Sequence, residues 1–275
     1  MFTTDVHLLQ FDKGQLAFQK FGHGPLVLLA FHGFGQTHQV FNSTKKRLES
    51  RFTVFALNLF FHGDSIYVDN QPLSKMDWQR LINSFLEAQR IERFSVLGFS
   101  LGGRFALATT ESFAHRIDQL ILIAPDGITN SFWYTLATQS AIGRHLFRYA
   151  LDHLAQLNRF GNTLVQLGLL NQSITRLVDY SLNTSQQRER VYQSWVSFRH
   201  IHPGLNTLGN LLTSHAIQVR FFTGAFDRIV PGTYILPLTN KLRCYELTVF
   251  KADHHRLIEL AVEQLVYSEK SDTLL

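Results

Sequence analysis

The feature that most constrains the fold is an alternation of apolar runs with helical patterns between residues 26 and 124. Continuous apolar runs are typical of strands buried on both faces of a parallel sheet. They cover Leu26–Phe31, Phe52–Leu59, Phe94–Leu97 and Leu120–Ala124. Helical periodicity predicts helices between them over Thr37–Glu49, Ser74–Ile91 and Leu101–Phe113. This alternation predicts an α/β protein with right-handed crossovers.

The pattern changes at about Asp126, and strand-like runs do not return until Gln218–Phe222 and Tyr245–Phe250. The intervening segment is longer than ordinary connections, so we expect it to have its own structure. We predict a core of residues 1–126 and 215–275, with a mostly parallel eight-stranded sheet, and an all-helical cap of residues 127–214. The cap helices are expected over Ser140–Leu157, Leu164–Leu182 and Gln186–His200.

Composition and short motifs exclude several functional classes. The net charge is +5, but the basic residues are scattered, so we expect no nucleic-acid partner. Cys244 is the only cysteine in the sequence, and neither H-E-x-x-H nor G-x-G-x-x-G occurs, so we expect no metal and no cofactor. With neither a signal peptide nor a run of 18 apolar residues, we expect a cytoplasmic protein without a membrane partner, either a monomer or a homodimer.

The strongest local motif is Gly98-Phe99-Ser100-Leu101-Gly102, which fits G-x-S-x-G. A predicted strand leads into it and a predicted helix follows it. A sharp turn between strand and helix exposes the serine hydroxyl near a helix N-terminus, where developing negative charge is stabilised. Ser100 is therefore predicted to be a nucleophile.

Three further motifs make the chain resemble the α/β-hydrolase fold family, in the branch with a helical cap. His32-Gly33-Phe34-Gly35 resembles the family's oxyanion loop, and Gly224–Pro231 resembles its acid loop. The segment 58–65 resembles the D-x-x-G-H-G-x-S turn, although Asn58 replaces the acid and Phe61 the first glycine. The resemblance extends from about Gln15 to Val266.

The resemblance implies a catalytic triad of Ser100, Asp227 and His254, in the chain order that this fold uses. Histidine accepts the serine proton, and a carboxylate orients the imidazole. Two alternatives remain open at this point. His255 is adjacent to His254, and Asp126 follows the strand after the nucleophile, from which some relatives draw their acid.

The same resemblance implies an oxyanion hole made by the backbone N–H groups of Phe34 and Leu101. The substrate pocket is expected to include His32, Gly33, Phe99 and Trp133. Phenylalanine is abundant, with 24 residues, and several of them fall near the predicted loops. We expect an aromatic wall around Ser100, comprising Phe31, Phe34, Phe60, Phe61, Phe99, Phe132 and Phe226.

These features favour a serine hydrolase that cleaves a small apolar or aromatic ester through an acyl-enzyme. One alternative is a C–C bond hydrolase or lyase of the same fold, because Gly98–Arg104 is similar to the corresponding stretch of the menaquinone-pathway synthase. Arg104 would then hold a substrate carboxylate, or else form a salt bridge on its helix. A further alternative is a non-catalytic protein of this fold that binds a small ligand.

Overall fold

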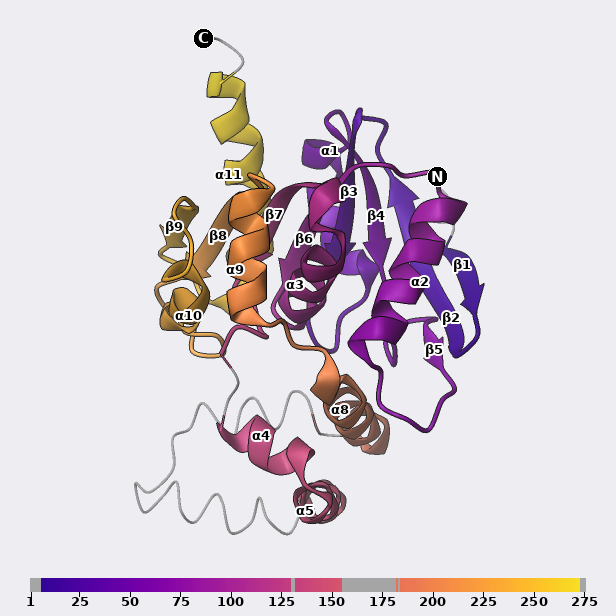
Figure 1. Ribbon diagram of the computed structural model, residues 1–275. Helices are drawn as coiled ribbons and strands as arrows, with labels where there is room; N and C mark the ends of the chain where they lie inside the picture. The colour runs from indigo at the N-terminus through magenta and orange to yellow at the C-terminus, as the bar shows by residue number, and fades with distance from the viewer. Residues whose placement is uncertain (1–5, 130–131, 155–181, 183, 273–275) are drawn as a thin grey trace. The chain divides into compact units, whose positions relative to one another are not determined.

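A computed structural model describes residues 6–129, 132–154, 182 and 184–272, and the chain divides into two compact units (Figure 1). The first unit comprises residues 1–129 and 201–275, and the second comprises residues 130–200. Residues 201–214, which were predicted to lie in the cap, belong instead to the first unit. The reason is that α9 (Leu205–Ser214) packs against α3 (Leu101–Phe113) through buried side chains such as Leu208.

The first unit is built on a sheet whose strands lie in the order β1-β2-β4-β3-β6-β7-β8-β9, with β5 beside β2. The strands are β1 (Val6–Phe11), β2 (Gly14–Phe21), β3 (Leu26–Phe31), β4 (Phe52–Leu57), β5 (Ile66–Tyr67), β6 (Phe94–Phe99), β7 (Ile117–Ile123), β8 (Gln218–Gly224) and β9 (Glu246–Phe250). From β4 to β9 every neighbouring pair is parallel, whereas β1 and β2 pair antiparallel. The predicted mostly parallel sheet is confirmed, and the short β5 was not predicted.

Helices cover both faces of this sheet. Helices α2 (Lys75–Ala88), α3 and α9 lie on one face, and α1 (Lys45–Leu48) and α11 (Leu257–Asp272) lie on the other (Figure 1). The short α10 (Leu236–Thr239) follows β8, and a 3-10 helix over His38–Thr44 precedes α1. Because both faces are covered, all six residues of β6 are buried, which explains its continuous apolar sequence.

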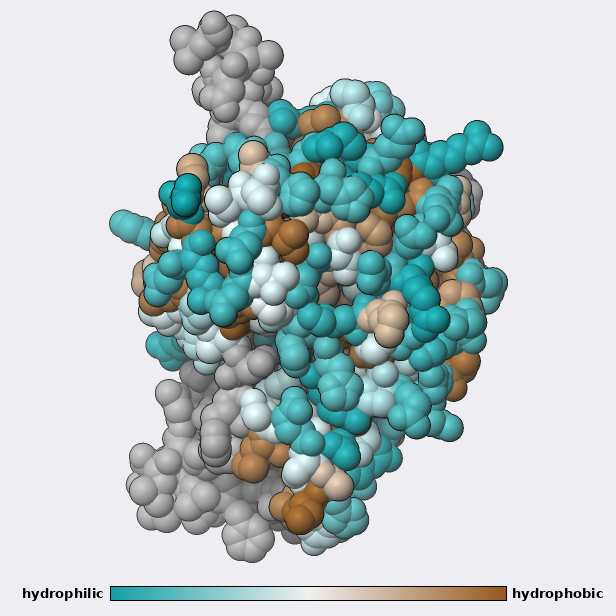
Figure 2. Space-filling model, viewed as in Figure 1, coloured by the Kyte–Doolittle hydropathy of each residue, from teal (hydrophilic) through white to brown (hydrophobic). Residues whose placement is uncertain are grey.

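The second unit contains α4 (Phe132–Gln139), α5 (Ala141–Asp152) and α8 (Ser185–Ser197). Its helices are joined by aromatic contacts, because Trp195 has its ring centroid 5.2 Å from those of both Tyr134 and Phe147. The opposite side of α5 exposes Ile142 and Leu146, and Figure 2 shows brown, hydrophobic surface over α4 and α5. The predicted helix over 164–182 falls largely outside the described residues, and α4 was not predicted.

The start of α2 is stabilised by a capping box that explains why the helix begins there. Ser74 Oγ accepts the Asp77 N–H at 3.0 Å, and Asp77 Oδ2 accepts the Ser74 N–H at 3.3 Å. Burial alone would raise the pKa of Asp77. Hydrogen bonds from Ser74, Lys13 and Arg80 outweigh burial and hold this pKa below its usual range.

We therefore expect Asp77→Asn to lower the free energy of unfolding at pH 7 by about 1–2 kcal/mol. A carboxyl with a depressed pKa stabilises the fold above its unfolded pKa. The loss should therefore shrink as the pH falls below about 4. Urea titrations at several pH values measure the difference in unfolding free energy between the variant and the unmodified protein. The substitution Asp118→Asn, at a more exposed aspartate, is the control. A difference that stays constant down to acid pH would contradict the assignment.

Candidate active site

Parallel pairing brings four loops to one edge of the sheet. Strands β3, β6, β8 and β9 run in the same direction, so their carboxyl ends meet at that edge. These ends lead directly to the residues that the sequence predicted, namely Phe34 after β3, Ser100 after β6, Asp227 after β8 and His254 after β9. The sheet thus gathers residues that are up to 220 positions apart in the chain.

Ser100 occupies a strained turn between β6 and α3. Its φ of 52° and ψ of −119° lie outside the regions that non-glycine residues usually adopt. The Ser100 N–H donates to the Ile123 carbonyl at 3.0 Å, which ties the turn to β7. A Cβ on Gly102 would lie 2.1 Å from the Phe31 carbonyl oxygen, so only glycine allows α3 to start this close to β3.

Asp227 and His254 are joined by a hydrogen bond of 2.6 Å between His254 Nδ1 and Asp227 Oδ2. The other carboxylate oxygen of Asp227 accepts the N–H groups of Ile229 and Val230, each at 2.9 Å. Both side chains are buried. This arrangement fixes the ring of His254 and leaves its Nε2 as the nitrogen that can exchange a proton with a hydroxyl.

Backbone contacts between two loops bring this pair together. The Ala225 N–H donates to the Phe250 carbonyl at 2.8 Å, and the Phe226 N–H donates to the Ala252 carbonyl at 3.1 Å. A Cβ on Gly224 would lie 2.5 Å from the Ala252 carbonyl oxygen. The glycine therefore permits the loop after β8 to lie against the loop after β9.

The two sequence alternatives are placed differently. His255 is exposed, and its ring lies nearly perpendicular to that of His254 at 6.3 Å. The Asp126 carboxylate accepts Nε and Nη2 of Arg104, at 3.1 and 2.9 Å. Asp227, rather than Asp126, is therefore the carboxylate bonded to His254.

The backbone N–H groups of Phe34 and Leu101 donate to no residue in the part of the chain that the structure describes. The peptide group that contains the Phe34 N–H is held through its carbonyl, which belongs to Gly33. His32 Nδ1 lies 2.8 Å from the Gly33 carbonyl oxygen, and Gln36 N–H lies 3.3 Å from the same oxygen. In a trans peptide the carbonyl and the N–H point in opposite directions, so these contacts direct the Phe34 N–H away from His32.

His32 is fully buried, and both of its ring nitrogens are used. Its Nε2 accepts the Leu59 N–H at 3.0 Å, so Nδ1 carries the proton that is donated to Gly33. Burial, followed by the neighbouring His62, lowers the pKa of His32 well below its usual value near 6.5. His32 is therefore a neutral support of the loop.

His62 supports the same loop from the other side, a role that the sequence analysis missed. Its Nε2 accepts the Gly35 N–H at 3.0 Å, and its Nδ1 lies 2.9 Å from the Phe60 carbonyl oxygen. The only signal in the sequence was its place in the 58–65 motif. Within that motif, Asn58 Oδ1 accepts the His38 N–H at 2.7 Å, and Phe61 has a φ of 66°, where the family has glycine.

Most of the predicted pocket residues do not form an open pocket wall. His32 and Gly33 are buried, which corrects their expected role as pocket lining. Phe99 is only 2% exposed and packs against the His254 ring, with 4.9 Å between the ring centroids. It supports the histidine. Trp133 lies in α4, but its side chain is outside the described part.

The predicted aromatic wall is also smaller than expected. Phe31 and Phe60 are buried, because Phe31 packs against Trp78 and Phe60 against Phe11. Phe34 and Phe61 are half-buried, and Phe226 is 64% exposed. The side chain of Phe132 is outside the described part. Among the described residues of this wall, Phe34, Phe61 and Phe226 remain accessible to solvent.

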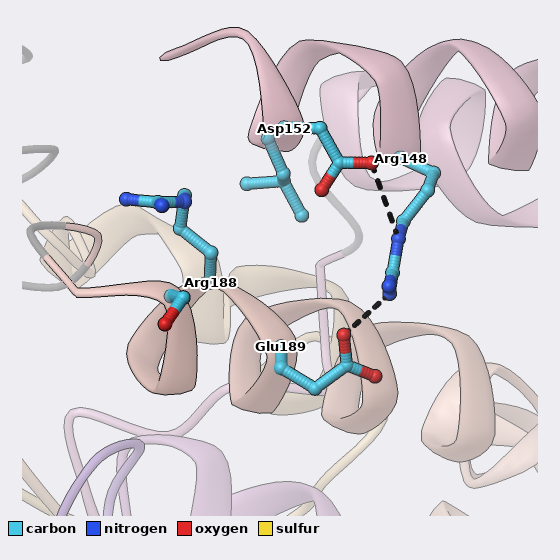
Figure 3. A pocket seen from close by; sticks show the side chains of 6 residues that line it. Arg148, Asp152, Arg188 and Glu189 are labelled. Carbon is cyan, nitrogen blue, oxygen red and sulfur yellow. Dashed lines mark hydrogen bonds and ion pairs between the residues drawn. The ribbon is translucent and has the colours of Figure 1, made fainter. Parts of the chain in front are cut away.

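A separate pocket of about 170 Å³ lies within the second unit, between α5 and α8 (Figure 3). It is lined by Arg148, Leu151, Asp152, Ser185, Arg188 and Glu189. Arg148 contacts both acids, Asp152 at 3.5 Å and Glu189 at 2.6 Å. The charges of the four charged side chains described there sum to zero, and no histidine is among the described lining residues.

Among the described residues, no three histidine, cysteine or acidic side chains form a group that could hold a metal ion. Nor does any helix in the described ranges have the length and apolar character needed to span a bilayer.

The lowered pKa of His32 makes the stability of the fold depend on pH. The unfolded chain takes up a proton near pH 6.5 that the folded chain excludes, so stability should fall as the pH drops below that value. His32→Asn keeps a donor for the Gly33 carbonyl but cannot titrate. We expect the slope of unfolding free energy between about pH 7.5 and 5.5 to decrease by up to ~1.4 kcal/mol per pH unit. Urea unfolding at several pH values measures this slope. An unchanged slope in the variant would refute the assignment of His32 as buried and neutral.

Comparisons with known proteins bear on the family. The model of the alpha/beta hydrolase fold family matches residues 26–259. An alpha/beta hydrolase enzyme from a Medee basin deep-sea metagenome library superimposes with a TM-score of 0.71 at 14% identity, covering 95% of this chain and 96% of that one.

Two curated relatives match parts of the chain. An uncharacterized protein of Mycobacterium tuberculosis is 36% identical over 115 residues, which cover 41% of this chain and 33% of the relative. The pimeloyl-[acyl-carrier protein] methyl ester esterase of Nitrosomonas europaea is 30% identical over 143 residues, 50% of this chain and 53% of that enzyme. The chain therefore spans about a third to a half of the length of these relatives. The family match over most of the chain, on the sheet described above, shows that the chain belongs to the α/β-hydrolase fold family.

Proposed function

We propose that this chain is a serine esterase that cleaves small apolar or aromatic esters through an acyl-enzyme. The observation that carries the proposal is the 2.6 Å hydrogen bond between His254 Nδ1 and Asp227 Oδ2, at the sheet edge where Ser100 follows β6. A serine hydroxyl is a weak nucleophile until a base removes its proton, and an oriented imidazole is such a base. The methyl ester esterase of Nitrosomonas, similar over half of the chain, supports ester chemistry.

Ser100 Oγ attacks the ester carbonyl while His254 Nε2 takes its proton. The N–H groups of Phe34 and Leu101 stabilise the negative oxygen of the tetrahedral intermediate. The intermediate collapses and the alcohol leaves with the proton from His254. Water, which gives its proton to His254, then attacks the acyl-enzyme. Release of the acid and return of the proton restore Ser100.

The accessible side chains at this edge support an apolar substrate. Phe34 and Phe61 are half-buried, and Phe226 and Ile229 are exposed on the loop after β8. Apolar side chains around a few polar groups are typical of sites that bind small molecules.

The C–C hydrolase or lyase alternative gains no support from Arg104. In the synthase-like form of this alternative Arg104 could hold a substrate carboxylate, but its side chain is 2% exposed and is bonded to Asp126. A protein that only binds a ligand needs no reactive serine, so the reactivity of Ser100 distinguishes the ligand-binding alternative from the esterase.

Ser100→Ala should abolish turnover on p-nitrophenyl esters of increasing acyl length, because no other residue of the proposed mechanism can form the acyl-enzyme. A fluorophosphonate probe should label the unmodified protein and not the variant. Ser112→Ala, on the same helix, is the matched control and should retain activity. Turnover that survives in Ser100→Ala would refute the serine mechanism, and failure of the probe to label would favour the binding protein.

Asp227→Asn should lower kcat by about 10³–10⁴-fold, because an amide no longer stabilises the correct imidazole tautomer and its positive charge. Asp126→Asn should retain at least about 1% of kcat, since Asp126 is not bonded to His254. Steady-state kinetics of the two variants on one ester decide between them. An equal or larger loss in Asp126→Asn would transfer the acid role to Asp126.

A further inference from the structure

The proposed oxyanion donor Leu101 belongs to the same peptide group as the Ser100 carbonyl. The peptide is trans, so the carbonyl and the N–H point in opposite directions. Whatever holds the Ser100 carbonyl therefore sets the direction in which the Leu101 N–H points. Geometry matters here, because an oxyanion donor acts only when it is aimed at the developing charge.

Two N–H groups hold this carbonyl from behind. The Gly103 N–H donates to it at 2.8 Å and the Asp126 N–H at 2.9 Å. The first contact lies within the opening turn of α3 and moves with the helix. The second contact, from the Asp126 N–H, comes from the loop after β7. It therefore fixes the Ser100–Leu101 peptide relative to the sheet.

Asp126 is in turn held by Arg104. One carboxylate oxygen accepts both Nε and Nη2 of the arginine, at 3.1 and 2.9 Å. The Arg104 side chain is 2% exposed, and that of Asp126 is 33% exposed. Arg104 lies on α3, four residues after Ser100, so the contacts form a closed ring from the Ser100 carbonyl through Asp126 and Arg104 back to the helix.

Two glycines allow this ring to close. A Cβ on Gly103 would lie 2.6 Å from the Pro125 Cβ, and a Cβ on Gly127 would lie 2.9 Å from the Arg104 Cα. The loop after β7 therefore lies directly on the first turn of α3. This close packing indicates that the ion pair between Arg104 and Asp126 supports the Ser100 turn, rather than being an incidental pair on the surface.

We propose that Arg104 and Asp126 are positioning residues, which hold the Ser100–Leu101 peptide so that the Leu101 N–H faces the oxyanion. The inference rests on the proposed esterase function and deepens it. In this role Arg104 neither contacts the substrate nor forms part of the solvent-exposed surface of α3. Asp126 contributes through its backbone N–H, and the ion pair keeps that N–H in place.

The test compares Arg104→Met with Arg220→Met. Arg220 is also 2% exposed and pairs with Glu246 at 2.9 Å, but it lies near the start of β8, away from the Ser100 turn. Three quantities are measured: kcat and KM on one ester, the Ki of a trifluoromethyl ketone of the same acyl group, and the urea midpoint. The ketone forms a tetrahedral adduct with serine whose oxyanion occupies the hole.

We expect Arg104→Met to lower kcat by about 10- to 100-fold and to raise Ki by a similar factor, with KM within about twofold. Arg104→Lys should recover part of both losses. Arg220→Met should lower the urea midpoint without changing kcat or Ki. If Arg104→Met does not fold, Arg104→Lys and Asp126→Asn provide the comparison, with smaller effects in the same direction.

An active protein in which Arg104→Met changes only stability, as Arg220→Met does, would overturn the positioning role and leave the esterase proposal intact. A rise in KM without a change in kcat would also overturn it, because that result indicates a direct contact with substrate. If the unmodified protein neither hydrolyses esters nor reacts with a fluorophosphonate, the proposed function fails and this inference fails with it.

Discussion

The site depends on hydrogen bonds that hold peptide groups in fixed directions. Ser100 has a backbone conformation that costs on the order of 1–3 kcal/mol, and it persists because its N–H is tied to Ile123 and its carbonyl to Gly103 and Asp126. Two of these partners come from β7, which pairs parallel with β6: Ile123 ends β7 and Asp126 lies in the loop after it. The strained conformation of Ser100 is therefore maintained because β7 is the neighbour of β6 in the sheet.

Buried neutral histidines extend the same constraint to the loop after β3. His32 and His62 each donate from one ring nitrogen and accept with the other. An imidazole can link two backbone groups in this way only while it is uncharged, because a protonated ring has no acceptor. The support of the loop and the exclusion of a proton from His32 are therefore two aspects of one arrangement.

Local patterns and the family motifs were sufficient to predict the fold and the sheet edge at which Ser100, Asp227 and His254 lie. The limits of β3 and α3 agree with their predicted ranges, since buried parallel strands and amphipathic helices leave clear periodicities. The strained turn at Ser100 was recognisable because its steric demands leave glycines at fixed spacing. Roles that depend on burial were not predictable. Phe99 ends β6 and His32 directly follows β3, as the motifs predict, but their exposure depends on which residues pack against them.

The contact between Arg104 and Asp126 left no signal either, because a spacing of 22 residues across a strand has no local pattern. The domain boundary failed for a related reason. Residues 205–214 form an amphipathic helix whether they pack on a cap or on a sheet, and only the contact with α3 decides.

The two segments of the first unit that flank the second unit are each held by a hydrogen bond within the first unit. Thr129 Oγ1 donates to the Tyr234 carbonyl at 2.8 Å, and the Gly204 N–H donates to Glu111 at 3.1 Å, close to the fully buried Ile201. The core thus completes its own packing at each junction. Replacing the intervening helices would therefore leave these hydrogen bonds, and the packing of the first unit at both junctions, unchanged.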